Sequence, residues 1–318
     1  MTGSLCNSER VAVLISTYNG QFYITDQLKS ILSQLKIEDR VFIRDDGSTD
    51  KTLELIKSVN DIRIEIIESD GNLGFGPSFM TLIHKVPKTF DFYFIADQDD
   101  VWIDGRVSRA LKALRNKNCP MMYCSRLELV NSKLESIGLS PLYTKTPSFY
   151  NAICQNIATG CTIAINQLAL FLIRSMPIEK YYDGRLYYHD WWLYLNISYF
   201  GTVVHDPIPS VLYRQHEFNQ IGMNDGLGRY YTIIKKILKN SWFSLLINQL
   251  NLFYEIHHKR IPNKDLEKIH NLCHGSSIQI ARSLIVNKNL EFQNHSDIIF
   301  FKILLIFEFF FRRLPSKI

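Results

Sequence analysis

Residues 92–102, FYFIADQDDVW, join five consecutive apolar residues to three carboxylates within four positions. A strand that ends in clustered carboxylates offers hard oxygen ligands, and such ligands suit Mg²⁺ or Mn²⁺. A solvated acidic turn, or a helix N-terminus capped by aspartate, is compatible with the same residues. The neighbouring segments therefore have to decide between a cation site and a plain turn.

The segments on either side alternate between strand and helix signals, which predicts an α/β fold. Four apolar runs have the composition of buried strands, at residues 11–16, 40–44, 62–68 and 91–96. Helical spacing appears over residues 23–34, and Ser48 or Thr49 can cap a second helix. Strands that are apolar on both faces are typical of a Rossmann-like, mostly parallel sheet flanked by helices. In such sheets, ligands bind beyond the carboxyl ends of the strands.

Polar or glycine-containing loops follow the first three predicted strands. Thr17 and Asn19 can reach a base or a ribose with short polar groups. Asp45 and Asp46 can accept hydrogen bonds from a base or from ribose hydroxyls. Gly74 lets the backbone approach a ligand closely, because glycine has no Cβ. Together these loops predict a nucleotide pocket at one edge of the sheet.

The loop after the fourth predicted strand would complete that pocket. Asp97 and Asp99 would hold the Mg²⁺ or Mn²⁺ that bridges the two phosphates of a nucleotide diphosphate. No G-x-G-x-x-G follows the first strand and the sequence contains no P-loop motif, so dinucleotide and P-loop sites lose their main support. We therefore expect a nucleotide-diphosphate ligand and a divalent cation.

In this order and spacing, the loops resemble those of the family 2 inverting glycosyltransferases, which have the GT-A fold. The matching stretches are LISTYN at 14–19, DDGSTD at 45–50, GNLG at 71–74 and the D-x-D element at 97–99. The resemblance covers residues 10–222. The form DQDDVW is most similar to the rhamnosyltransferase branch, whose members help to build O-antigen and capsular polysaccharides in bacteria.

The resemblance implies a role for each loop. Asp45 would lie at the base of the nucleotide, and Asn72 would contact the nucleotide sugar. Asp97 would lie near the ribose or the metal, and Asp99 would bind the metal. Asp46 would support Asp45 rather than touch the ligand. The resemblance thus implies a nucleotide-diphosphate sugar as the donor.

An inverting transfer also needs a base for the acceptor hydroxyl, and a carboxylate with a tuned pKa suits that step. Asp190, in the run YHDWW, matches the position where the family places its base. His189 replaces the more usual acidic residue and would assist or orient the base. Trp191 or Trp192 could stack on a sugar ring. A helix N-cap is the competing interpretation of Asp190, because the residues after it have helical spacing.

Two further segments are assigned to the site. Gly160, in NIATGC at residues 156–161, resembles the small-residue loop that shapes the acceptor pocket in this family. His216 could complete the metal shell, and Arg214 could bind a phosphate through its planar guanidinium. A tight turn before a core strand and a solvated loop histidine are the alternatives for Gly160 and His216.

The composition is that of a folded protein made and kept inside the cell. The chain has 318 residues, of which 46% are apolar and 21% are charged, enough for one large domain or two modest ones. Its six cysteines form no C-x-x-C pair, which favours reduced thiols. Residues 1–10 are polar and lack the apolar core of a signal peptide. We therefore expect a cytoplasmic protein.

The charge is distributed unevenly along the chain. Residues 225–318 carry fourteen Lys and Arg against seven Asp and Glu, whereas the preceding residues carry twenty-two against twenty-four. We predict a catalytic domain over residues 1–222 and a helical, basic and aromatic region over residues 223–318. Helices in that region would break at three positions, near Asn240, Pro262 and Asn287.

The apolar run at residues 298–311 predicts how this region is used. It has fourteen residues, too few for a membrane span, which needs about 20. Its phenylalanines and the adjacent Arg312 and Arg313 suit an interfacial helix on the anionic inner leaflet of the membrane. Packing on the catalytic domain or in a homodimer is the alternative. No nucleic-acid-binding motif accompanies the positive charge, so we expect no nucleic-acid partner.

These observations predict a metal-dependent inverting glycosyltransferase. It would move rhamnose from dTDP-rhamnose, or a hexose from a UDP-sugar, to a glycan or lipid-linked acceptor. A sugar-phosphate nucleotidyltransferase would share the sheet and the cation, but residues 16–20 lack the glycine-rich basic loop that it needs. A non-catalytic scaffold that binds sugar nucleotides for polysaccharide assembly would need neither Asp99 nor Asp190.

Overall fold

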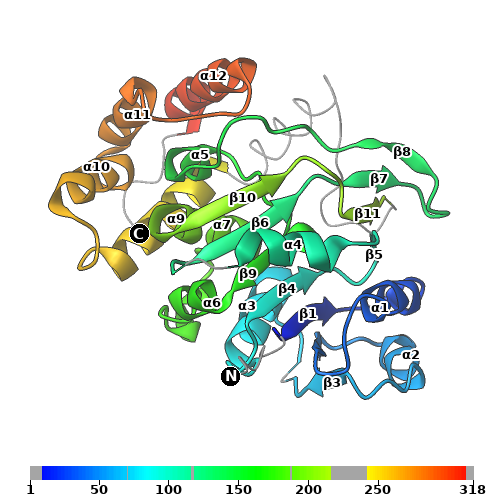
Figure 1. Ribbon diagram of the computed structural model, residues 1–318. Coiled ribbons are helices and arrows are strands. Elements are labelled where there is room, and N and C mark those ends of the chain that lie inside the picture. The colour runs from blue at the N-terminus through cyan, green and yellow to red at the C-terminus, as the bar shows by residue number, and fades with distance from the viewer. Residues whose placement is uncertain (1–8, 70, 116–117, 187, 216–241, 313–318) are drawn as a thin grey trace, which may run out of the picture.

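The computed structural model of the chain describes residues 9–69, 71–115, 118–186, 188–215 and 242–312. A central sheet of seven strands dominates it (Figure 1). These strands are β1 (Val11–Thr17), β2 (Arg40–Asp45), β3 (Ile64–Ile67), β4 (Phe92–Ala96), β6 (Met121–Ser125), β9 (Ala164–Asn166) and β10 (Thr202–Asp206). Their order is β10-β6-β9-β4-β1-β2-β3, and every neighbouring pair is parallel except the two that involve β9. The predicted mostly parallel sheet is confirmed.

Helices cover both faces of this sheet. They are α1 (Ile24–Leu32), α2 (Thr52–Ser58), α3 (Phe75–Lys85), α4 (Arg106–Leu114), α5 (Phe149–Cys154), α6 (Gln167–Ile173), α7 (His189–Phe200), α9 (Trp242–His257), α10 (Asn263–Cys273), α11 (Ser277–Val286) and α12 (His295–Arg312), with short 3₁₀ helices η1 (Gly160–Thr162) and η2 (Ile178–Tyr181).

Alternation along β1 explains why the strand is apolar on both faces. Val11, Val13 and Ile15 belong to the core formed with α1, α2 and α4. Ala12 and Leu14 belong to the core on the opposite face, which includes α3, α5, α6, α7 and the C-terminal helices. Successive side chains of a strand point to opposite faces, so a strand buried between two helical layers must be apolar at every position.

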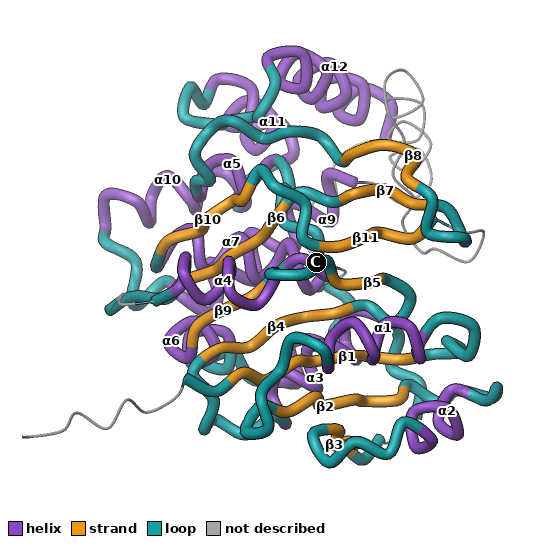
Figure 2. Tube along the Cα trace, turned by 45° about the vertical axis from the view of Figure 1, so that its right-hand side comes forward, coloured by secondary structure: helices purple, strands orange, loops and turns teal. Residues whose placement is uncertain are grey.

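A second, four-stranded sheet lies beyond the carboxyl ends of the central strands (Figure 2). Its strand order is β5-β11-β7-β8, with bounds β5 (Val101–Trp102), β7 (Glu128–Val130), β8 (Ser136–Leu139) and β11 (Val211–Arg214). Three of them follow central strands directly, since β5 comes after β4, β7 after β6 and β11 after β10. The sequence patterns described above gave no sign of this second sheet.

The C-terminal helices lie beyond the β10 edge of the sheet, where Figures 1 and 2 both place α12. The expected breaks near Pro262 and Asn287 are confirmed, because α10 begins at Asn263 and α11 ends at Val286. Asn240 and the predicted domain boundary at residue 222 lie outside the described residues. Side chains of α9 to α12 join the same apolar core as α3 and α7. Among the described helices, none is long and apolar enough to cross a membrane.

The start of α2 differs from the prediction. The helix begins at Thr52 with Lys51 as its N-cap residue, and neither Ser48 nor Thr49 caps it. The Ser48 hydroxyl instead donates a hydrogen bond of 2.6 Å to Asp45. Ser48, which the sequence pattern predicted as a helix cap, thus binds the carboxylate of Asp45 instead.

Candidate active site

The loops after β1 and β2 are joined by hydrogen bonds around Asp45. Its carboxylate accepts from the Thr17 hydroxyl at 2.9 Å and from the Ser48 hydroxyl and amide at 2.6 and 2.8 Å. The Asn19 side-chain oxygen accepts from the Thr49 amide at 2.9 Å. Thr17 and Asp45 are buried and Asn19 is exposed, so the predicted nucleotide residues of these two loops form one connected wall.

Asp46 connects the β2 loop to the glycine-containing loop before α3. It pairs with Arg44, which is 1% exposed, and accepts hydrogen bonds from the amides of Leu73 and Gly74 at 2.8 and 2.9 Å. Gly74 has φ +82°, a conformation that favours glycine. Asp46 therefore holds the Gly74 loop, whereas the role expected for it, support of Asp45, stays a prediction. Asn72, in the same loop, is exposed.

Gln98 ties the acidic loop to the loop after β1. Its side-chain oxygen accepts from the Tyr18 amide and its side-chain nitrogen donates to the Tyr18 carbonyl, both at 2.9 Å. A Cβ at Gly20 would lie 2.3 Å from that oxygen, so a larger residue would displace the Gln98 side chain from this position. The Gln27 side chain donates to the Asp97 carbonyl at 2.7 Å. The sequence pattern marked Gln98 as part of a motif without indicating that it fixes the loop.

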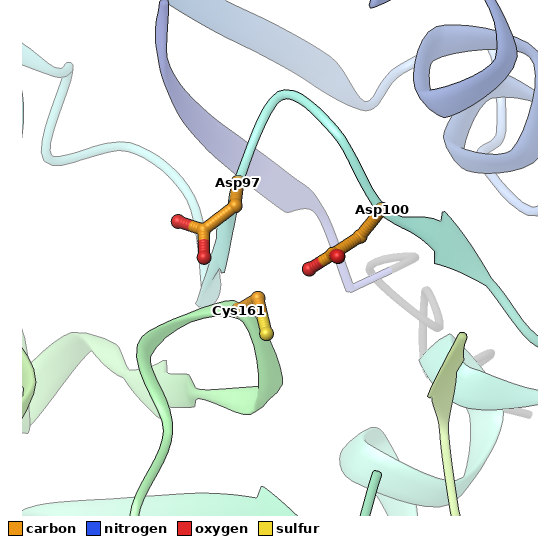
Figure 3. Close-up of side chains that lie close together, drawn as sticks. All are labelled: Asp97, Asp100 and Cys161. Atoms are coloured by element: carbon orange, nitrogen blue, oxygen red, sulfur yellow. The ribbon is translucent and has the colours of Figure 1, made fainter. Parts of the chain in front are cut away.

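Asp97, Asp100 and Cys161 form a cluster at the carboxyl end of β4 (Figure 3). Burial raises the pKa of Asp97, and the charges of Asp99 and then Asp190 raise it further. Burial, then Asp99 and Asp97, likewise raise the pKa of Asp100. These carboxyls are therefore close enough to influence one another electrostatically, as a cation or diphosphate site requires.

Arg214 lies under the acidic loop and is 3% exposed. Its side chain donates to the carbonyls of Asp99 and Ser132 at 2.9 and 2.7 Å, and its amide donates to Asp100 at 3.1 Å. The structure thus places Arg214 as an anchor of this loop, while its predicted contact with a phosphate stays a prediction. Asp99 is half-buried, and His216 lies outside the described residues.

Asp190 lies in the first turn of α7 and is 9% exposed. Burial raises its pKa from 3.8 to about 6, although the Trp191 amide, the Asn156 side chain and the Gly160 amide donate hydrogen bonds that oppose the rise. The N-cap residue of the helix is Tyr188, so the competing N-cap interpretation of Asp190 is wrong. A carboxyl that titrates near neutral pH suits a general base.

His189 lies beside this carboxyl in an aromatic environment. Its ring stacks on Phe79 with centroids 4.4 Å apart and meets the edge of Phe75 at 5.0 Å. Burial lowers its pKa to about 3, which keeps the imidazole neutral. A Cβ at Gly160 would lie 2.9 Å from His189 Nε2, so the small residue leaves room for this ring. The structure therefore brings Gly160, His189 and Asp190 together.

The two tryptophans after Asp190 do not face a ligand. Trp191 is 4% exposed and its indole donates to the Ala152 carbonyl at 2.5 Å, while Trp192 is 1% exposed and belongs to the main core. Both rings are buried because α7 is enclosed on all sides, with every residue from His189 to Ile197 buried. The expected stacking on a sugar ring is incompatible with this burial, so neither tryptophan enters the proposed acceptor site.

Arg106 is a buried cation that sequence reasoning missed. It is fully buried and donates to Ser210 Oγ and to the Cys161 carbonyl, both at 2.7 Å. Its guanidinium lies 4.5 Å from the Trp102 ring centroid. Its charge lowers the pKa values of Asp97 and Cys161 against the larger effect of burial. Its position at the start of a helix with basic residues gave no signal of this role.

A Rossmann-like sheet with an acidic loop after β4 and a tuned carboxyl on a neighbouring helix is the architecture of a GT-A glycosyltransferase. The solved structure of Staphylococcus aureus TarS shares this fold, with a TM-score of 0.53 and 14% identity over 96% of this chain and 93% of that one.

Sequence comparisons identify the family. The model of glycosyl transferase family 2 matches residues 12–176, which is more than half of the chain. The chain is 30% identical to the dTDP-rhamnosyl transferase RfbG of Shigella flexneri, over 72% of this chain and 80% of the relative. It is 23% identical to an Escherichia coli relative, the UDP-Glc:alpha-D-GlcNAc-diphosphoundecaprenol beta-1,3-glucosyltransferase WfgD, over 54% of this chain and 67% of WfgD. The chain belongs to glycosyl transferase family 2 and is a glycosyltransferase.

Proposed function

We propose that this glycosyltransferase inverts the anomeric centre while moving a sugar from a nucleotide-diphosphate donor to a glycan or lipid-linked acceptor in polysaccharide synthesis. Asp190 is the observation that carries the proposal, because it is a buried carboxyl with a raised pKa beside Asp97 at the carboxyl edge of the sheet. The likeness to RfbG favours dTDP-rhamnose as the donor. A UDP-hexose is the alternative, which the likeness to WfgD supports.

In the proposed reaction, the acceptor hydroxyl attacks the anomeric carbon while Asp190 takes its proton. The bond from that carbon to the nucleotide diphosphate breaks, and the diphosphate leaves with the bonding electron pair. A pKa of about 6 leaves Asp190 mostly ionised near neutral pH and still basic enough to accept the proton. The neutral His189 ring stacks on Phe79 at the start of α7, one residue before this carboxyl.

Asp97 and Asp99 are the residues proposed to hold Mg²⁺ or Mn²⁺. Asp97 Oδ1 is buried and has no hydrogen-bond partner among the described residues, which fits a ligand oxygen. A divalent cation here would supply electrostatic stabilisation of the leaving diphosphate. The Thr17–Asp45 wall and the Asp46-held glycine loop would position the nucleotide on the other side.

A donor screen tests the proposal. The full chain is mixed with a bacterial glycolipid extract and a panel of dTDP- and UDP-sugars, and released nucleotide diphosphate is measured with Mn²⁺ and with chelator. We expect release from one donor class, with a loss of at least tenfold in chelator. Activity that chelator leaves unchanged would defeat the metal assignment. Release of inorganic diphosphate from a nucleoside triphosphate and a sugar phosphate would instead identify a nucleotidyltransferase. Binding of a sugar nucleotide without turnover would identify a scaffold.

We further propose that α12 places the enzyme on the inner face of the plasma membrane. Ile299, Ile303 and Ile306 are 51%, 59% and 44% exposed, and their spacing puts them on one side of the helix. Asp297 and Leu305, on the opposite side, are buried. An apolar stripe in a region with excess positive charge suits an anionic lipid surface, and a lipid-linked acceptor would be found there.

Cosedimentation with phosphatidylglycerol vesicles tests the α12 proposal. We expect Ile303→Glu to weaken vesicle binding at least tenfold. Ile137→Glu, at a residue of β8 that is 55% exposed, is the matched control and should bind as wild type does. Wild-type binding by Ile303→Glu would contradict the proposal. A stable dimer in light scattering that Ile303→Glu dissociates would show that the stripe is a homodimer interface instead.

A further inference from the structure

The cluster of Asp97, Asp100 and Cys161 combines two carboxylates with a thiol. One ligand atom from each residue lies within 4.8 Å of the other two. Figure 3 shows both carboxylates on the loop after β4, with the Cys161 sulfur on the η1 segment below them. Asp100 and Cys161 are fully buried, and Asp97 is half-buried, so the cluster opens toward the proposed donor site on the Asp97 side.

The carboxylates of this cluster have free acceptor capacity. Asp100 Oδ1 accepts from the Arg214 amide at 3.1 Å, but Asp100 Oδ2 is buried without an N–H or O–H partner among the described residues. Asp97 Oδ1 is in the same situation. Figure 3 shows the side chains of Asp97, Asp100 and Cys161 close together at the carboxyl end of β4. Buried carboxylate oxygens almost always have a partner. The Cys161 thiol is the hydrogen-bonding neighbour of Asp100, and a cation that replaces the thiol proton would be shared by Asp97, Asp100 and Cys161.

We propose that Asp97, Asp100 and Cys161 bind a divalent cation that accepts a sulfur ligand, such as Zn²⁺ or Co²⁺. Mixed thiolate and carboxylate ligands are typical of these ions and not of Mg²⁺. Bonds of about 2.0 to 2.3 Å to one ion bring its ligand atoms to roughly 3 to 4.5 Å from one another. The observed separations therefore need only small side-chain rotations.

The charges around the cluster fit a divalent ion. A bound ion would displace the protons of this group, so that two carboxylates and a thiolate face it with three negative charges, while the buried Arg106 donates to the Cys161 carbonyl. A divalent cation would offset most of this negative charge, which is costly to bury without a partner. This site shares Asp97 with the proposed Mg²⁺ or Mn²⁺ site. A sulfur-binding ion would therefore compete for Asp97 and inhibit transfer.

Cobalt absorption tests the site without requiring turnover. The full chain, reduced with a phosphine, is titrated with Co²⁺, and the near-ultraviolet charge-transfer band of a cobalt–thiolate bond is recorded. We expect about one Co²⁺ per chain with this band, loss of the band in Cys161→Ser, and at least tenfold weaker binding in Asp100→Asn. Failure of the glycosyl-transfer proposal would leave this readout unchanged.

Cys273→Ser is the matched control. Cys273 Sγ lies 3.1 Å from His274 Nδ1, so this thiol and imidazole are another place where Co²⁺ could bind. This variant should keep the band. A band that persists in Cys161→Ser or disappears in Cys273→Ser would overturn the proposal. The absence of any band in folded wild type would show that the cluster is a protonated network. Circular dichroism checks folding, and Cys161→Ala with Asp100→Asn decides the question if Cys161→Ser does not fold.

Discussion

Two groups of buried aspartates lie at the same edge of the sheet, and their surroundings differ. Asp45 and Asp46, after β2, accept hydrogen bonds from their own loop, from Thr17 and from the glycine loop, and Asp46 pairs with Arg44. Asp97, Asp100 and Asp190, after β4 and on α7, have raised pKa values because burial outweighs their hydrogen bonds.

This difference in hydrogen bonding distinguishes carboxylates that stabilise loops from carboxylates that are available to a ligand. Carboxylates whose oxygens are occupied by the protein stabilise loops, because they satisfy backbone amides that would otherwise lack partners. Carboxylates that are buried with unused acceptors cost stability and are typical of functional sites. We therefore propose that the β2 group builds the wall of the nucleotide site and that the β4 and α7 group contacts the cation, the donor and the acceptor. Four variants can break or sharpen this contrast.

The largest effect is expected from Asp97→Asn. It removes a charge from the proposed diphosphate site, so transfer should fall at least about 10³-fold, or about 4 kcal/mol of barrier. Unfolding free energy should stay equal or rise, because a poorly solvated carboxylate is lost. Nucleotide-release kinetics and urea denaturation measure the two quantities. A variant that loses stability but keeps its rate would place Asp97 with the scaffold.

The opposite outcome is expected from Asp46→Ala. Removing the partner of buried Arg44 should destabilise the fold by about 3 to 5 kcal/mol. The partly exposed pair of Arg63 and Asp61 provides the control, since Asp61→Ala should cost about 1 kcal/mol or less. Chemical denaturation of the two variants measures the contrast. Equal losses would show that burial does not distinguish these ion pairs.

The pH dependence of stability is a third test, on Asp190→Asn. The folded pKa of Asp190 is raised from 3.8 to about 6 by burial, so its contribution is fully favourable below pH 4 and is lost as pH rises through 6. Asp190→Asn has no ionisable group at this position, so its unfolding free energy does not fall in this way as pH rises. Its unfolding free energy relative to wild type should rise between pH 4 and pH 7, by up to about 3 kcal/mol. A difference that is constant with pH would contradict the raised pKa.

A smaller effect is expected from Gly20→Ala. The added Cβ would lie 2.3 Å from the Gln98 side-chain oxygen and would displace the acidic loop. We expect a loss of about 1 to 3 kcal/mol in unfolding free energy. Combining it with Gln98→Ala removes the clash, so the double variant should be no less stable than Gln98→Ala alone. Thermal melts of the three variants check this. Additive losses would mean that Gln98 does not contact Gly20.

The first four strands of the sheet and the positions of the polar loops after them could be predicted, because both depend on local patterns. The alternation of apolar runs and helices fixed β1 to β4 and put Thr17, Asp45 and Asp97 at one edge. The distinction between Asp46 and Asp97 could not be predicted, since it depends on which distant amides each carboxylate meets. Aspartate is bound by backbone amides in the loop after β2, whereas Asp97 in the loop after β4 keeps an oxygen without a hydrogen-bond partner among the described residues.

Long-range partners account for what the sequence did not reveal. Cys161 reaches the acidic loop from a segment more than fifty residues later, and Arg106 donates to its carbonyl. The second sheet depends on β5, which has two residues and pairs with β11. Their position next to Asp190 predicts ligand contact for Trp191 and Trp192, but both are buried because α7 is enclosed on all sides. No local spacing encodes these contacts.

The most direct test of the account compares wild type with Asp190→Asn in nucleotide-diphosphate release across pH, with donor affinity measured in both. We expect wild-type release to fall about tenfold per pH unit below about pH 6, where Asp190 becomes protonated. Asp190→Asn should bind the donor as wild type does, lose release at least about 10³-fold above pH 6, and lack the fall in release that wild type shows below pH 6. Wild-type release by a folded Asp190→Asn protein would contradict the account.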